Sequence, residues 1–191
     1  AVFGGIKMAT VGLRDLYVAT ITKADGGAET YGTPRRLAKA ISAKMSIEYA
    51  DGTLYADDGV DVYEKEFVSG ELTLNVNDLA PADVALLFGQ TQDTDGVIYA
   101  GETDDPPYVA IGFRAKKPGG TYRYIWLYKV KFSTPDEEYQ TKENGIEFKT
   151  PEIVGKIVKR DDGMWKADYT AEPTDDTAKA WFTAVKVKAA A

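Results

Sequence analysis

Apolar and polar residues alternate with a period of two along much of this chain, and that pattern restricts it to a fold built mainly from β-strands. In residues 41–49, apolar side chains at odd positions alternate with Ser, Lys and Glu, which predicts a half-buried strand. Leu72, Leu74 and Val76 alternate with polar residues in the same way. Weaker patterns predict strands over residues 13–22, 109–114, 145–148, 153–159 and 164–170.

Residues 122–132 carry the strongest strand pattern. Aromatic or apolar residues occupy the even positions from Tyr122 to Phe132, and we expect them to share one face. The other face is polar only at its ends, which is typical of a central strand buried on both sides. Core packing therefore fits this aromatic face better than the stacking of bases or sugars, which flanking basic residues would assist.

Two segments show helical rather than strand signals. Pro81 and Gly89 bracket apolar residues at helical spacing, with Pro suited to the first turn and Gly to the residue after the last. A shorter helical turn follows Pro173, where we expect Thr174 to cap and two aspartates to lie near the positive end of the helix dipole. Its apolar stripe consists of Ala178, Trp181, Phe182 and Val185.

These elements predict one mainly β (α+β) domain over residues 1–191, a β-sandwich or open barrel with one packed α-helix. We expect flexible terminal arms at residues 1–10 and 186–191, and Met8 fits a native start. Residues 50–67 separate two good strands and are predicted to form a long hairpin loop.

The composition excludes most catalytic chemistries. The 191 residues include no histidine and no cysteine, which removes Ser–His–Asp catalysis, cysteine nucleophiles and the usual zinc ligands. The net charge of −7 disfavours a grip on nucleic acid, although such a chain can surround DNA without binding it. No apolar run is long enough for a membrane helix. We therefore expect no enzyme activity, no cofactor, no metal and no membrane association.

Residues 50–67 are the candidate interaction site, because the segment is acidic yet carries apolar residues that a projecting loop would expose. It is either a solvated hairpin that folds back on its own domain or an arm that docks on another subunit. The predicted docking residues are Asp51, Tyr55, Asp57, Asp58, Val60, Asp61, Val62, Tyr63, Glu64 and Glu66. Tyr55, Val60, Val62 and Tyr63 are the expected apolar anchors.

Two acidic turns resemble calcium loops at first sight, at residues 57–61 and 93–96. Neither has the calcium-loop spacing with a glutamate at position twelve, which favours turns with solvated carboxylates. Paired carboxylates such as Asp104 and Asp105 show no spacing that indicates a catalytic cleft.

Several segments in order resemble the major tail proteins of long-tailed, non-contractile bacteriophages. The opening VGLRDLYVA at 11–19 is similar to the start of those proteins, and ETYGTPRRLAKA at 29–40 follows where they carry a Tyr-Gly-x-Pro-x-x-Leu-Ala pattern. YKVKFSTP at 128–135, Glu138, TKE at 141–143 and IEFKTP at 146–151 continue the similarity. Together these segments span most of residues 11–169.

The resemblance implies a structural virion protein of the tail tube. Members assemble as hexameric rings that stack into a hollow tube, with strands lining the lumen and long hairpins and arms bridging the rings. It further implies partners at the tail tip or initiator, a tape measure and a terminator, with genomic DNA passing through. The implied location is the virion tail, assembled in the bacterial host cytoplasm.

The acidic composition of the chain fits a tail tube, although many other proteins share that composition. A DNA conduit should repel phosphate, and we hypothesise a net negative lumen. The alternatives are a type VI secretion-like tube protein, which shares the fold, and a non-polymerising carbohydrate-binding or virion-decoration β-sandwich.

Overall fold

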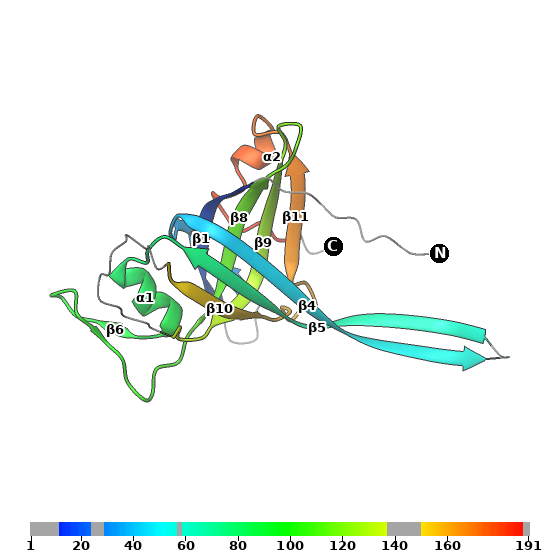
Figure 1. The fold of residues 1–191 in the computed structure, drawn as a ribbon, viewed down its shortest axis with the longest axis horizontal. Helices are drawn as coiled ribbons and strands as arrows, with labels where there is room; N and C mark the ends of the chain where they lie inside the picture. Colours follow the sequence, from blue (N-terminus) through cyan, green and yellow to red (C-terminus); the bar gives the residue numbers. More distant parts are fainter. Residues whose placement is uncertain (1–11, 24–28, 57–58, 137–149, 189–191) are drawn as a thin grey trace, which may run out of the picture.

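The computed structural model describes residues 12–23, 29–56, 59–136 and 150–188, and its architecture is mainly β (Figure 1). In these residues one antiparallel sheet contains β1 (Gly12–Lys23), β2 (Glu29–Tyr31), β3 (Arg35–Arg36), β4 (Ala40–Ala56), β5 (Gly59–Val76), β8 (Tyr108–Lys116), β9 (Tyr122–Phe132), β10 (Glu152–Ile157) and β11 (Lys166–Ala171). Separate from it, β6 (Thr91–Gln92) pairs with β7 (Ile98–Tyr99). The mainly β prediction is confirmed. The predicted strand at 145–148 and the arm at 1–10 lie outside the described residues.

The strand order is β2-β1-β8-β9-β10-β5-β4, and the sheet branches at β9. The first half of β9 pairs with β11, while its end at Val130–Phe132 pairs with β10. In the described part of the chain β4 pairs only with β5 and so ends the sheet. The result is an open sheet that ends in the long strands β5 and β4 (Figure 1).

The sheet has an apolar cluster on each face. On one face, side chains from β1, β5, β8, β9 and β10 pack together, and α1 (Pro81–Phe88) adds Leu87 and Phe88. Since strands from both ends of the order share this cluster, the sheet curves around it. On the other face, Tyr124 and Trp126 of β9 pack against Trp181 and Val185 of the C-terminal segment. The expected central strand, buried on both sides, is therefore β9, and its aromatic residues belong to the core.

A β-bulge in β9 overturns the prediction that all its even-numbered residues share one face. Val109 pairs with Val130, but Ile111 pairs with Leu127, so β9 contributes one extra residue. The extra residue reverses the alternation. Tyr128 therefore stays with Tyr124 and Trp126 in the C-terminal cluster, whereas Val130 and Phe132 join the cluster that α1 covers.

Both predicted helices occur, with one correction at the second. Gly89 ends α1 in the left-handed region at φ 69°, where a Cβ would lie 2.3 Å from the Asp105 carbonyl oxygen. The second helix, α2 (Asp176–Lys179), has a single turn. Its cap is Asp175, whose side chain accepts from the Ala178 N–H, and not Thr174 as predicted. No helix in the described residues is both long and apolar enough to span a membrane.

Residues 50–56 and 59–67 form paired strands and not the predicted loop. The β4–β5 ladder continues from Ala50 opposite Glu66 to Ala56 opposite Gly59. At about 3.3 Å per residue, this outer part is roughly 20–25 Å long. It projects from the body as a two-stranded arm (Figure 1). The interpretation in which the segment folds back on its own domain is therefore wrong; we call residues 50–67 the outer hairpin.

Candidate functional site

The outer hairpin brings the predicted docking residues onto one ladder. Tyr55 lies opposite Val60, and Asp51 lies opposite Lys65. Val62, Tyr63, Glu64 and Glu66 pair with Leu54, Thr53, Gly52 and Ala50. Asp61 is the extra residue of a register shift between Leu54 and Tyr55. Asp57 and Asp58 lie outside the described residues.

Aromatic side chains hold the root of the outer hairpin to the body. The ring of Phe67 stacks on Trp165 with centroids 4.8 Å apart, and Tyr49 meets Phe67 edge-on at 6.4 Å. The ammonium groups of Lys65 and Lys166 lie 4.4 Å and 5.2 Å from the Tyr49 and Trp165 ring centroids. No local sequence pattern marks this anchor, because Phe67 of β5 and Trp165, just before β11, are distant in the chain.

An ion pair adds to the same root. Lys159 Nζ donates to Glu66 Oε1 at 2.8 Å, and this hydrogen bond lowers the pKa of the exposed Glu66 carboxyl. Exposed pairs of this kind contribute little to stability. The aromatic stack is therefore expected to hold the root of the arm more strongly than this ion pair does.

A second surface carries an excess of positive charge at the start of β1. The β1–β8 register places Arg14 opposite Arg114 and Gly12 opposite Lys116, and β3 places Arg36 opposite Tyr17. Side chains that are direct partners across an antiparallel pair lie on the same face. Arg14, Arg36, Arg114 and Lys116 thus share a face, which we call the cationic corner.

Asp15 is the acidic partner within the cationic corner. Its carboxylate accepts from Arg114 Nε at 2.5 Å and from Arg36 Nη2 at 2.9 Å. The residue sits at a β-bulge with φ 55°, a left-handed conformation that is uncommon outside glycine. Asp15 pairs with two of the four cations, Arg36 and Arg114, and these five described residues together carry a formal charge of +3 in a chain that is acidic overall.

A groove of about 460 Å³ opens beside the cationic corner. Tyr17, Tyr124 and Phe182 form its apolar wall, and Tyr17 stacks on Phe182 with centroids 4.5 Å apart. Asp15, Arg114 and Lys179 supply its polar rim. The groove therefore combines aromatic surface with nearby cations, a combination suited to an acidic segment that also carries apolar side chains.

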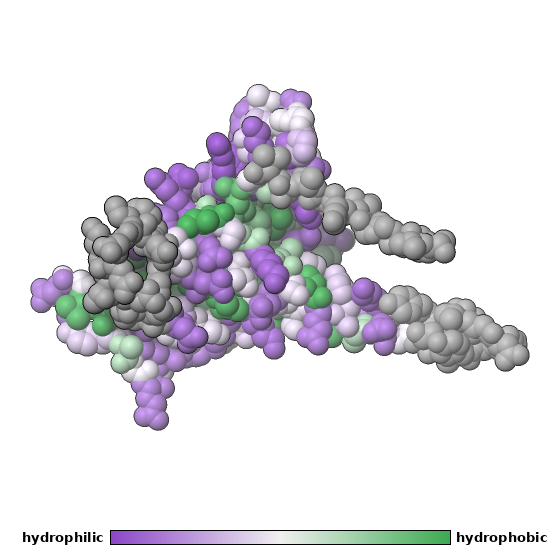
Figure 2. All heavy atoms as spheres, viewed as in Figure 1, coloured by the Kyte–Doolittle hydropathy of each residue, from purple (hydrophilic) through white to green (hydrophobic). Residues whose placement is uncertain are grey.

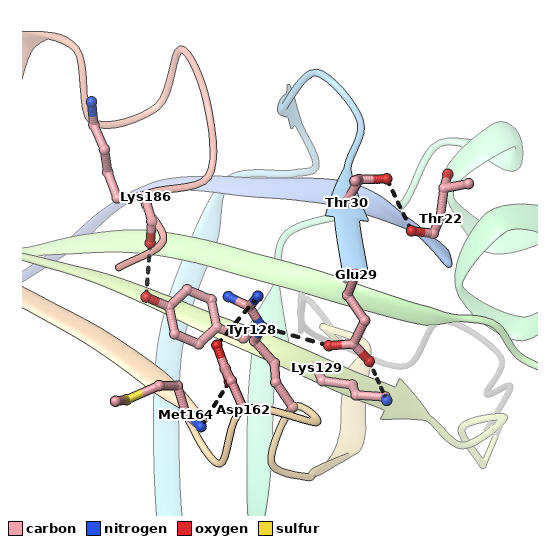
Figure 3. A network of polar contacts seen from close by, with 9 residues as sticks. Thr22, Glu29, Thr30, Tyr128, Lys129, Asp162, Met164 and Lys186 are labelled. Atoms are coloured by element: carbon pink, nitrogen blue, oxygen red, sulfur yellow. Dashed lines mark hydrogen bonds and ion pairs between the residues drawn. The ribbon is translucent and has the colours of Figure 1, made fainter. Parts of the chain in front are cut away.

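A buried polar cluster joins β2, β9 and the β10–β11 connection (Figure 3). Glu29, with only 2% of its side chain exposed, accepts from Lys129 Nζ at 2.5 Å and lies 3.5 Å from Arg160 Nε. The Arg160 guanidinium lies 5.1 Å from the Tyr128 ring centroid and 5.6 Å from that of Tyr31. Such a pairing compensates buried charges that would otherwise be costly.

The tyrosines of this cluster resist ionisation. Burial raises the pKa of Tyr31 far above its ordinary value, and burial also raises the pKa of Tyr128. Tyr128 Oη donates to the Lys186 carbonyl oxygen at 2.8 Å and so ties down the C-terminal segment. Lys186 belongs to the predicted C-terminal arm, of which residues 189–191 lie outside the described part. Neutral tyrosines and paired charges are suited to holding segments together.

The acidic turn at Asp93 organises its own backbone. Asp93 Oδ1 accepts from the backbone N–H groups of Val97 at 2.8 Å and Asp95 at 3.0 Å, and Tyr99 donates to Oδ2. The hydrogen bond from Val97 lowers the pKa of Asp93. The predicted turn at residues 93–96 is confirmed, whereas Asp57 and Asp58 of the other predicted turn lie outside the described residues. Among the residues that the structure describes, no three metal-ligating acidic side chains form a group.

Most of the visible surface is hydrophilic, and hydrophobic residues appear in small separate areas (Figure 2). In comparisons with known proteins, no family model matches this chain and no curated protein is significantly similar to it. The fold, the outer hairpin, the cationic corner with its groove and the resemblance of the sequence segments are the features that bear on function.

Proposed function

We propose that this protein is a structural subunit of a bacteriophage tail tube, which polymerises as stacked hexameric rings around the path of the ejected DNA. The observation that carries the proposal is the outer hairpin, a paired arm that leaves the body (Figure 1). Beyond the contact of Phe67 with Trp165 the arm projects from the body (Figure 1), and acidic strands with apolar residues are suited to docking on a neighbour.

The open sheet supports the same proposal. β4 is long and has one side unpaired in the described part of the chain, and free edges of this kind pair with further strands unless they are covered. Closure of neighbouring sheets into a ring would satisfy these edges. The excess of carboxylates would keep DNA from adhering to the wall of such a tube.

Electron microscopy of the purified chain across a concentration series, run beside light scattering, tests the proposal. We expect rings or hollow tubes that grow with concentration or on addition of preformed tail tips. Deletion of residues 51–66 should leave folded monomers or rings without long tubes. Normal tubes from this deletion would contradict the docking role of the arm, and a basic lumen would contradict the electrostatic part.

A strict monomer that is also unresponsive to tail tips would overturn the tube proposal. Retention of such a monomer on a polysaccharide gel would instead identify a carbohydrate-binding module.

A further inference from the structure

We propose that the groove beside the cationic corner receives the outer hairpin of a second copy of this chain. The inference deepens the proposed function, on which it rests, by naming the surface that the arm contacts. Residues 51–66 contain six acidic residues and one lysine, a formal charge of −5, whereas the cationic corner with Asp15 carries +3. The two surfaces therefore attract each other across copies.

The cationic corner is unusual within its own chain. Arg14 and Arg114 are direct cross-strand partners, and like charges in that position repel each other. Asp15 relieves this repulsion only in part, and it does so from a left-handed backbone conformation. Binding of an acidic strand would supply the missing negative charge.

Apolar residues occur in both partners. Tyr17, Tyr124 and Phe182 give the groove an aromatic wall, and the sequence of the outer hairpin contains Tyr55, Val60, Val62 and Tyr63. Apolar side chains at the centre with charges around them are the usual arrangement of a specific interface. Ala178 and Lys179 of α2 line the groove, and α2 lies well away from the arm of the same chain (Figure 1).

Disulfide trapping between full-length chains tests this contact, since the natural chain has no cysteine. One variant carries Ala56→Cys, at the last described position of β4, and the other carries Thr183→Cys, at the exposed rim of the groove. The matched control replaces Thr183→Cys by Thr94→Cys, an exposed threonine in the turn between β6 and β7. We expect the groove pair to cross-link about tenfold faster than the control pair at low salt, because the opposite charges steer the encounter.

Charge variants separate a specific contact from random collisions. Arg14→Glu combined with Lys116→Glu should lower the cross-linking rate of the groove pair to that of the control pair. Lys44→Glu combined with Lys156→Glu makes the same charge change at exposed sites of β4 and β10. With these changes the groove pair should still cross-link severalfold faster than the control pair.

Equal rates for the groove pair and the control pair would overturn the inference. If the unmodified chain still forms tubes in that case, the proposed function stands and the arm docks elsewhere. If trapping is selective but no rings or tubes form under any condition, the contact stands and the tube proposal fails.

Discussion

The indole Nε1 of Trp126 donates a 3.0 Å hydrogen bond to the backbone carbonyl of Trp181. This bond joins the middle of β9 to the C-terminal segment, 55 residues later in the chain, in a buried position. The C-terminal segment is thereby part of the core. Tyr128 fixes the same segment through Lys186, so two donors on one strand hold it.

Replacement of Trp126→Phe should lower the free energy of unfolding by about 1–3 kcal/mol, because the carbonyl of Trp181 loses its donor and the core loses volume. Urea denaturation followed by circular dichroism measures the change. Tyr122→Phe on the same strand, only half-buried, is the control and should be nearly neutral. Equal effects of the two changes would contradict the role of the Trp126 bond.

Gly112→Ala should destabilise the protein by about 1–3 kcal/mol, since a Cβ at Gly112 would lie 2.6–2.8 Å from the ring of Trp126. Gly52→Ala is the matched control, because a Cβ there has no described atom within 4 Å. Thermal unfolding of the two variants gives the comparison. A neutral Gly112→Ala would show that the Trp126 ring moves aside freely.

Tyr128 and Tyr31 should respond differently to loss of the hydroxyl group. Tyr128→Phe removes the bond to Lys186 and should cost about 1 kcal/mol of stability. The Tyr31 hydroxyl is buried without a hydrogen-bond partner in the described part of the chain, so Tyr31→Phe should be neutral or stabilising. Denaturant titrations of both variants measure the contrast. A clear loss on Tyr31→Phe would show that its hydroxyl has a partner.

Acid should weaken the cap of α2. The hydrogen bond from the Ala178 N–H lowers the pKa of Asp175, so its charged form is favoured in the folded state. That stabilisation is present above the ordinary aspartate pKa of about 3.9 and disappears as pH falls through the lowered folded value. Asp175→Asn keeps an acceptor but does not titrate, and its stability deficit should therefore shrink between about pH 5 and pH 2. Denaturant titrations across that range test the trend, and a constant deficit would contradict it.

Trp165→Ala should shorten or abolish tubes while the body stays folded, because the arm loses the ring on which Phe67 stacks. Trp165→Phe keeps an aromatic partner and should retain most of the assembly. Electron microscopy gives tube lengths, and circular dichroism controls for folding. Normal tubes from Trp165→Ala would show that the direction of the arm does not depend on this stack.

The elements that are most predictable from the sequence are those whose signals lie within the element itself. The alternation around Leu72 and Leu74 and the Pro81–Gly89 bracket each predict an element without reference to its neighbours. The bulge in β9 escaped prediction, because an extra residue is defined only by the register of the partner strand. The paired strands at 50–56 and 59–67 depart from the predicted loop for a related reason, because cross-strand pairing extends the ladder far beyond the body.

The cationic corner was equally hidden from sequence reasoning. Asp15 and Arg114 are 99 residues apart, and Arg36 reaches the same carboxylate from a third strand. No local pattern marks such a cluster, whereas the composition of the outer hairpin marks it as unusual at once. The arm was therefore predictable as a candidate, and its proposed receptor was not.

The outer hairpin and the groove are different surfaces on one chain, and this has a consequence for any polymer they build. A contact between unlike surfaces is directional, and repetition of it gives an open chain of contacts unless a rotation closes it. One end of such a polymer presents free arms and the other presents empty grooves. The two ends would then differ chemically, so growth and capping each require recognition of only one of them.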